Sequence, residues 1–347
     1  MQGLVLWGAN NLFHVLGEDG SRRLCAIKGK RLKDQSGVYN ALAAGDRVQL
    51  AVDPATPDRG LVVGLLPRRN VFGRFNEKGR AVQAIAANVD MVVCVSSPSL
   101  PPFRPRFIDR VAVLAEAAAV PLLIVLNKID LGLRQAIEER LSSYASLGYE
   151  GLLVSARSGL GLAELRERLS GKTSVFAGQS GVGKSSLLNA LEPGMGRRVD
   201  AVSEKYERGK HTTTMAELAT LADGVTRIID TPGVRRLALR GIDPNCLDAY
   251  FPELAPLSPR CEFGLSCTHT DEHGCRITRS VEDGLILADR FESYLRIREE
   301  LAATAGYRPR EGRRVSTRSR GDGARKARRA SGLRPGETYR DGDQDDE

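Results

Sequence analysis

The segment GQSGVGKS, Gly178–Ser185, has the residue types and spacing that bind phosphate groups. Its glycines let the backbone curl so that successive N–H groups point at phosphate oxygens, and a following helix N-terminus adds positive potential. Lys184 would reach the outer phosphates, and the Ser185 hydroxyl would ligate Mg²⁺. The strand pattern TSVFAG precedes the segment and the helix pattern SSLLNAL follows it, which is the required context. We therefore expect nucleotide binding by Gly178, Gln179, Ser180, Gly181, Val182, Gly183, Lys184, Ser185 and Ser186.

A second group of residues suits the recognition of a nucleotide base. Asn127, Lys128 and Asp130 belong to NKID, which follows the strand pattern PLLIVL. A carboxylate that accepts two hydrogen bonds from guanine would be left unpaired by adenine, so Asp130 favours guanine. The tripeptide SAR closes the strand pattern GLLVS, where Ser155 and Ala156 would bring a backbone N–H near guanine O6. Alone, N-K-x-D is also a common surface tetrapeptide that caps helices.

Two segments after the phosphate loop carry groups for a magnesium nucleotide. DTPG ends the strand pattern TRIID, so Asp230 can hold Mg²⁺ through water and the Gly233 N–H can sense a γ-phosphate. GKHTTT lies between that strand and the phosphate loop, and either Thr212 or Thr213 can complete the Mg²⁺ shell. Each signal is weak alone, but the set agrees on one bound ligand.

The run from Cys261 to Cys275 offers ligands for a metal ion. Cys261, Cys267, His269 and Cys275 supply three thiolates and one imidazole, a complete set for a tetrahedral structural Zn²⁺. Clustering with histidine indicates a metal rather than disulfides in a cytosolic chain. His273 is a rival for His269, and the spacing is not the common C-x-x-C, so ordinary buried residues are the alternative. The segment has little apolar content, so metal binding would supply its folding energy.

The composition describes a multidomain chain that stays in the cytoplasm. Its 347 residues exceed the roughly 250–300 over which a single core grows. No apolar stretch approaches the roughly 18 residues of a membrane helix, and the N-terminus does not read as a secretory signal. The net charge is +8, and Arg308–Arg329 holds ten cations against two acids, which is the same excess. A polyanionic partner is therefore favoured, although a solvated disordered tail is the alternative reading of that segment.

The elements that position these groups follow from hydrophobic patterning. Five short β-like runs between Gly3 and Leu66 predict a small barrel, an OB-fold being the commonest candidate and an SH3-like barrel the alternative. From Asn88, apolar strands alternate with helices near 107–119, 134–146 and from 185, which predicts a parallel sheet that binds its ligand at the strand C-terminal ends. A helix is predicted from about Val281 to Leu301, and a disordered tail beyond Tyr307.

Taken in order, these motifs resemble a known family. NKID and SAR precede the phosphate loop instead of following DTPG, as in circularly permuted GTPases. With a barrel before and a Cys/His module after, Gly3 to Leu301 resembles the ribosome small subunit-dependent GTPase family, RsgA/YjeQ. The resemblance implies GTP hydrolysis stimulated by the small ribosomal subunit, rRNA binding, a role in late maturation of that subunit, Mg²⁺ with GTP and one structural Zn²⁺. The C-x-H spacing is similar to the family pattern and favours His269.

The implied organisation has a fold class and boundaries. We expect an OB-like barrel that binds RNA at 1–70, a circularly permuted α/β P-loop GTPase domain at 71–240, a mainly α zinc-binding module at 241–305 and a basic tail at 306–347. The chain is expected to act as a monomer away from membranes. We hypothesise that the permuted order joins the γ-phosphate sensor to the zinc module, so that GTP fixes the orientation of that module on RNA.

Hydrolysis needs a group that orients water. Ras-type GTPases use a Gln just after Asp-x-x-Gly, but Val234 stands there, so unassisted turnover should be slow. His211, beside the candidate Mg²⁺-binding threonines, is the candidate catalytic residue, in agreement with the role usually proposed in this family. The alternative is that His211 contacts RNA or solvent. Rival functions for the whole chain are a small-molecule phosphotransferase and a non-catalytic RNA-binding module in which nucleotide only stabilises the fold.

Overall fold

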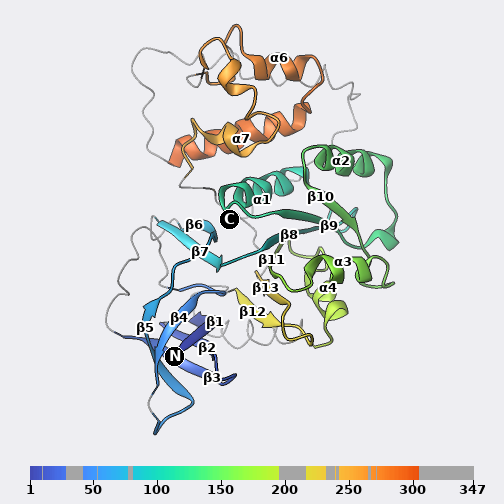
Figure 1. Cartoon of the computed structure of the whole chain (residues 1–347). Helices are drawn as coiled ribbons and strands as arrows, with labels where there is room; N and C mark the ends of the chain where they lie inside the picture. The colour runs from blue at the N-terminus through green and yellow to red at the C-terminus, as the bar shows by residue number, and fades with distance from the viewer. Residues whose placement is uncertain are drawn as a thin grey trace, which may run out of the picture. The chain divides into compact units, whose positions relative to one another are not determined.

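The structure is a computed structural model that describes residues 1–9, 11–28, 42–52, 54–76, 81–194, 216–231, 239, 242–264, 267–270 and 272–304. The chain divides into two compact units, Met1–Gly241 and Ile242–Glu347. Figure 1 labels the helices and strands of both units. Among the described residues, none of the helices combines the length and apolar character needed to cross a bilayer.

The first unit begins with a closed barrel of five strands. Its members are β1 (Gln2–Ala9), β2 (Leu12–Gly17), β3 (Arg22–Ile27), β4 (Arg47–Ala51) and β5 (Arg59–Leu65). They pair in the order β1-β2-β3-β5-β4, and β4 closes the barrel on β1. Burial alternates along β2 and β3, so every second side chain points into the barrel. The apolar interior comprises Val5, Phe13, Val15, Cys25, Ile27, Leu42, Val48, Leu50 and Val62. The predicted OB-like barrel is therefore confirmed.

A two-stranded hairpin that the sequence patterns did not predict follows the barrel. It consists of β6 (Val71–Asn76) and β7 (Ala81–Ala87), which pair antiparallel. The chain then enters the central sheet through Asn88, a residue with a left-handed backbone at φ 56°. Asn and Asp tolerate this conformation better than other non-glycine residues. Asn88 thus sets the direction in which the chain leaves the hairpin.

Polar contacts connect the barrel to the residues around Asn88, where the chain enters the central sheet. The Asn88 side chain donates to the Gly45 carbonyl at 2.9 Å and accepts from the Arg69 backbone N–H at 2.9 Å. Arg68 donates through two nitrogens to the Asp46 carboxylate, each at 2.7 Å, and the Asp46 side chain is 0% exposed. Gly45 packs so closely that a Cβ there would lie 2.2 Å from the Ala87 carbonyl oxygen. The barrel and the sheet are therefore joined by directed, partly buried contacts.

The central sheet has six strands in the order β10-β9-β8-β11-β13-β12. They are β8 (Met91–Ser96), β9 (Leu122–Leu126), β10 (Glu150–Leu153), β11 (Thr173–Gly178), β12 (Glu217–Thr220) and β13 (Arg227–Asp230). The pairs β10–β9, β9–β8, β8–β11 and β11–β13 are parallel, as predicted. The edge strand β12 is antiparallel to β13, a difference from the prediction. A short turn links these two strands, and a parallel pair would need a long crossover.

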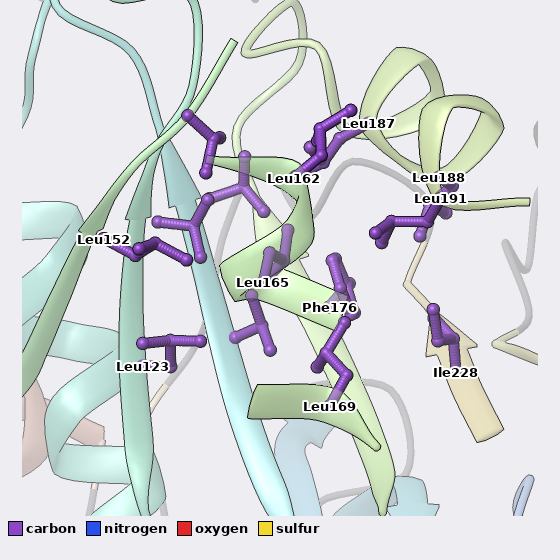
Figure 2. Close-up of a cluster of buried hydrophobic side chains, with 14 of the residues drawn as sticks. Leu123, Leu152, Leu162, Leu165, Leu169, Phe176, Leu187, Leu188, Leu191 and Ile228 are labelled. Carbon is purple, nitrogen blue, oxygen red and sulfur yellow. The ribbon is translucent and has the colours of Figure 1, made fainter. Parts of the chain in front are cut away.

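Helices cover both faces of the sheet. The helix α1 (Pro105–Ala117) and the helix α2 (Gln135–Ser146) share one face, where Tyr144 donates to the buried Asp109 carboxylate at 2.8 Å. The helices α3 (Leu162–Leu169) and α4 (Lys184–Leu191) contribute to the hydrophobic cluster on the other face. Figure 2 shows Leu162, Leu165 and Leu169 of α3 beside Phe176. This packing holds the start of α4 against the end of β11.

The second unit is mainly helical among its described residues. It contains the 3₁₀ turns Leu247–Tyr250 and Ser258–Arg260, the helix α6 (Arg276–Glu282) and the helix α7 (Ala288–Thr304). The helix predicted over 281–301 is confirmed from Ala288 onward as α7, but its predicted start was wrong because residues 283–287 separate α6 from α7. Gly284 adopts φ 75°, and the N–H groups of Leu285 and Ile286 both donate to the Ser280 carbonyl. This left-handed glycine ends α6 and lets the chain start α7 in a new direction.

We expect the Asp46–Arg68 pair to matter for barrel stability. Arg68→Met would leave a buried carboxylate without its cation, so the free energy of unfolding should fall by about 3–5 kcal/mol. Adding Asp46→Asn should recover part of that loss because the charge is gone. Trp7 is the only tryptophan of the chain and lies on β1, so its fluorescence in a urea titration reports barrel unfolding. A loss below about 1 kcal/mol would contradict the prediction.

Candidate functional site

The predicted phosphate loop connects β11 to α4 at the C-terminal edge of the sheet. Gly181 and Gly183 have φ values of 82° and 85°, in the left-handed region that favours glycine. A Cβ at Gly183 would lie 2.6 Å from Nδ2 of Asn127, and one at Gly178 would lie 2.8 Å from the Val95 carbonyl oxygen. The motif glycines are therefore required by the local geometry. Ser185 is half-buried in the first turn of α4, and Ser180 and Ser186 are exposed.

Lys184 and Asp230 meet although they are far apart in the sequence. Lys184 Nζ lies 2.5 Å from Asp230 Oδ1, and the two side chains are 8% and 3% exposed. Asp230 is the last residue of β13, which pairs with β11, so sheet register brings its carboxylate to the phosphate loop. Thr231, which the sequence reading missed, donates its hydroxyl to the Phe176 carbonyl at 2.6 Å. This bond fixes the chain where it leaves β13.

Asn127 joins three loops through one buried side chain. Its Nδ2 donates to the carbonyl oxygens of Val182 at 3.0 Å and Gly183 at 3.3 Å. Its Oδ1 accepts from the backbone N–H of Ala156 at 3.0 Å. Asn127 is 1% exposed, so these bonds form away from water. The predicted base-reading segments are thus attached directly to the phosphate loop.

Lys128 makes a second connection between the same loops. Its backbone is left-handed at φ 67°, and its Nζ donates to the carbonyl oxygens of Leu100 and Gly181. Leu100 belongs to the loop between β8 and α1, which the sequence patterns did not associate with a site. The amino group consequently holds a third loop at the edge of the phosphate loop.

Asp130 occupies an exposed position with one oxygen already held. Ser155 donates its hydroxyl to Asp130 Oδ1 at 2.6 Å, and the Ser155 oxygen accepts from the Ser158 N–H at 3.1 Å. Ser155 is 0% exposed, whereas Asp130 is exposed. A buried hydroxyl therefore orients a carboxylate that stays accessible to a ligand from solvent.

Several predicted residues lie outside the described part of the chain. They are His211, Thr212, Thr213, Gly233, Val234 and the Arg-rich segment at 308–329. The roles assigned to them above stay predictions.

The second unit brings the four predicted metal ligands together. The ligand atoms of Cys261, Cys267, His269 and Cys275 all lie within 4.8 Å of one another, and all four residues are buried. The sulfur atoms of Cys261 and Cys275 are 3.9 Å apart, and they lie 3.7 and 3.5 Å from His269 Nδ1. His273 is exposed and does not belong to this cluster, so the structure selects His269 between the two.

These distances fit a tetrahedral ion of zinc size. With bonds of about 2.3 Å to sulfur and 2.0–2.1 Å to nitrogen, regular tetrahedral edges are about 3.8 Å between sulfurs and 3.6 Å between sulfur and nitrogen. The observed values of 3.9, 3.7 and 3.5 Å lie close to those edges. The cluster can therefore hold a metal ion without rearrangement of these three ligands.

Neighbouring groups support the ligands. The backbone N–H of Arg276 donates to Cys261 Sγ at 3.3 Å and that of Thr278 to Cys275 Sγ at 3.4 Å. Burial raises the pKa of Cys275, but donation from His269 and Thr278 outweighs it, so this pKa lies below its ordinary value. Ser258, also missed from sequence, places its hydroxyl 3.3 Å from His269 Nε2. Such contacts orient a ligand imidazole.

Comparison with known proteins identifies close relatives over most of the chain. The family model described as RsgA GTPase matches residues 65–240. A protein of Chlorobaculum parvum named small ribosomal subunit biogenesis GTPase RsgA is 40% identical over 308 residues, which cover 87% of this chain and 98% of the relative. A protein of Moorella thermoacetica with the same name is 39% identical, with the same coverage of 87% and 98%.

Solved structures agree with this similarity. YjeQ from Thermotoga maritima matches with a TM-score of 0.66 and 33% identity, over 88% of this chain and 99% of that one. YloQ, described as a circularly permuted GTPase, matches with a TM-score of 0.62 and 26% identity, over 89% and 96%. The similarity therefore extends through the barrel, the sheet and the second unit.

The bonds of Asn127 lead to a prediction with an isosteric control. Asn127→Ala removes a donor and an acceptor from a buried position and leaves the Ala156 N–H unpaired, so the free energy of unfolding should fall by about 1–3 kcal/mol. Asn127→Asp keeps the acceptor but turns a negative charge toward two carbonyl oxygens, so it should be at least as destabilising. Urea unfolding followed by circular dichroism measures both. A wild-type value for the Asp variant would show that the bonds to Val182 and Gly183 contribute nothing.

Proposed function

Because the chain belongs to the RsgA GTPase family, we propose that it acts with the small ribosomal subunit during biogenesis of that subunit, hydrolysing GTP when the subunit is bound. The chain is a GTP-hydrolysing enzyme, as the family model and the curated relatives indicate. The observation that carries the proposal is the convergence of Asn127, Lys184 and Asp230 on one loop at the C-terminal edge of the sheet.

The phosphate loop is proposed to bind the GTP phosphates. Its backbone N–H groups and the start of α4 would face the phosphate oxygens, and Lys184 would exchange its bond with Asp230 for the outer phosphates. Ser185 and Asp230 offer the hard oxygen ligands that Mg²⁺ prefers, so these residues would hold the ion with Thr212 or Thr213. When bound, Mg²⁺ neutralises charge on the β- and γ-phosphates.

Guanine selection is assigned to the loops that Asn127 connects. Asp130 would accept from guanine N1 and N2, and a backbone N–H of the SAR segment, which contains Ser155 and Ala156, would lie near O6. Ser155 supports this assignment because it holds the Asp130 carboxylate in one orientation before ligand binding. Preorganised acceptors of this kind reject a base that cannot donate to them.

The step that orders the attacking water is assigned to His211. Val234 has an apolar side chain and cannot donate or accept the hydrogen bonds of a water-orienting glutamine. We expect the small subunit to place His211 in the site, where it would orient water toward the γ-phosphate. Gly233 would sense that phosphate through its N–H. Because the subunit would be needed to place His211, GTP turnover should depend on the subunit.

The cluster in the second unit is proposed to bind one structural Zn²⁺. Four protein ligands complete a tetrahedron, so the ion has no position for a catalytic water. Its role would be to hold Cys261, Cys267 and Cys275 together between short turns with few apolar side chains. The module and the barrel are proposed to contact rRNA on either side of a central GTPase domain, with the boundaries at 70, 240 and 305 expected from sequence. We further propose a monomer free of membranes.

Phosphate release from GTP and from ATP, with and without purified small subunits, tests the enzymatic proposal. Hydrolysis of GTP should rise at least about tenfold with subunits, and ATP should stay a poor substrate. Equal turnover of both nucleotides that ignores the subunit would instead favour a phosphotransferase.

Two variants assign this activity to the site. Lys184→Ala should lower the stimulated rate by about 10²–10³-fold because a cation that faces the transferred phosphate is lost. Asp130→Asn should lower the preference for GTP over ATP on the order of 100-fold. Retention of the GTP preference in the Asn variant would remove Asp130 from base recognition.

Metal analysis tests the zinc assignment. The purified chain should contain one zinc ion, and Cys275→Ser or His269→Ala should lose it and unfold the second unit. Cys246→Ser is the matched control, because Cys246 is an exposed cysteine of the same unit and should leave the zinc content unchanged. Stoichiometric zinc in Cys275→Ser would show that the ligands were assigned wrongly.

A further inference from the structure

The outer surface of the barrel over β1, β2, β3 and β5 is apolar, which is unusual for a solvent-facing sheet. Strand alternation places Phe13 and Val15 in the interior and turns His14 outward between them. On β5, Val62 is buried, whereas Leu61 and Val63 are 43% and 40% exposed. Large apolar residues thus lie on the side of these strands that the barrel interior does not use.

Register brings those outward residues into neighbouring rows. Leu12 is opposite Ala26, and Ala26 is opposite Leu61, so one row crosses three strands. In the next row, Trp7 is opposite His14, and His14 is opposite Leu24. Leu12 is 45% exposed and Leu61 is 43% exposed, so solvent reaches both ends of the first row. We call the outward side chains of these two rows, with Val63, the outer barrel face.

Two rings of the outer barrel face are already stacked. The centroids of Trp7 and His14 are 4.0 Å apart and the ring planes differ by 18°. The neighbouring Gly8 faces inward, where a Cβ would lie 2.1 Å from the Phe13 ring, so the backbone beside Trp7 is fixed. Burial and the nearby Arg22 guanidinium lower the pKa of His14, so its ring is neutral at pH 7. The pair is a flat, uncharged π surface on rigid strands.

Cations surround this surface. Arg22 and Lys28 are exposed at the two ends of β3, and Arg59 is exposed at the start of β5, opposite Leu24. Asp58, the neighbour of Arg59 in sequence, is an exposed acid at the same edge. The balance of these four charges is positive. An anion with flat apolar groups would match both the rings and the cations.

We propose that the outer barrel face binds unpaired nucleotides of RNA, with a base stacked on the Trp7–His14 pair and phosphates at Arg22, Lys28 and Arg59. This inference rests on the proposed function for the source of the RNA, the small subunit. Base stacking on aromatic rings beside a basic groove is how OB barrels bind single strands without reading sequence. Duplex RNA keeps its bases stacked inside the helix and cannot offer them to the ring pair.

The single tryptophan of the chain makes a local test available, because all tryptophan emission arises at Trp7. The full-length protein is titrated with a single-stranded oligouridylate of about 12 nucleotides, within the site sizes of OB barrels, and with a duplex of equal length. The single strand should quench Trp7 emission and the duplex should not. RNA bound elsewhere on the chain leaves this signal unchanged.

Variants that retain Trp7 identify the neighbouring contacts. His14→Ala and Arg59→Ala should each move the quenching midpoint to at least about fivefold higher RNA concentration. Arg59→Ala should also reduce the slope of log affinity against log salt by about 0.7, the value for one phosphate of a single strand. Arg168→Ala is the matched control, since it removes a cation that is 44% exposed on α3 and pairs with Glu150. Arg168→Ala should change neither the quenching midpoint nor the slope of log affinity against log salt.

Four outcomes would overturn the proposal. They are unchanged Trp7 emission at saturating single strand, equal quenching by duplex, equal shifts for Arg59→Ala and Arg168→Ala, and a response to purified ribosomal proteins but not to RNA. The last outcome would mean that the outer barrel face contacts protein. Failure of the GTP hydrolysis test would leave the Trp7 result standing, so the inference and the proposed function can fail separately. A cooperative urea unfolding transition of each variant without RNA shows that its barrel has folded.

Discussion

The parallel register of β11 with its two neighbours decides where the functional groups of the first unit lie. Gly178, at the end of β11, is opposite Val95 of β8, and Phe176 is opposite Asp230 of β13. On the other side, Leu126 at the end of β9 is opposite both Ser96 and Leu153. The strands β8, β9, β10, β11 and β13 therefore end at nearly the same level, and the loops that follow them meet there. The bonds of Asn127 and the Lys184–Asp230 pair are possible only because of this alignment.

A sheet of this kind can form whatever the order of its strands along the chain. Hydrogen bonds and side-chain packing depend on which strands are neighbours, and both are the same whether NKID precedes or follows the phosphate loop. What the permuted order changes is the identity of the chain ends. Here β13 ends at Asp230 and the second unit begins at Ile242, so residues 231–241 alone connect them.

Sequence reasoning succeeded where one residue type has one physical use. The left-handed glycines of the phosphate loop, the apolar runs of β8, β9 and β11, and the Cys/His cluster were all predicted, because few other residues satisfy those positions. It missed Thr231, Ser258 and Leu100, whose contributions are a hydroxyl or a carbonyl that many residues could supply. The hairpin β6–β7 was missed because its strands lack a strict apolar alternation. The break between α6 and α7 depends on Gly284 taking a positive φ, and helical patterning alone does not reveal it.

The distribution of charge separates long-range attraction from local recognition. The net charge of the chain is +8, and residues 308–329 alone hold ten cations and two acids, so the remainder of the sequence sums to 8 − 8 = 0. Attraction to a polyanion at a distance therefore arises mainly from that segment, and it falls as salt is added. Residues 1–70 hold ten Lys and Arg residues against six Asp and Glu residues, a smaller excess than that of residues 308–329. The contribution of the barrel to recognition therefore depends more on where its charges lie. Three cations around a rigid ring pair favour one class of contact over others, whereas a net excess of arginine attracts any polyanion. The proposed placement of RNA thus depends on strand register in the barrel, as the proposed GTP site depends on strand register in the sheet.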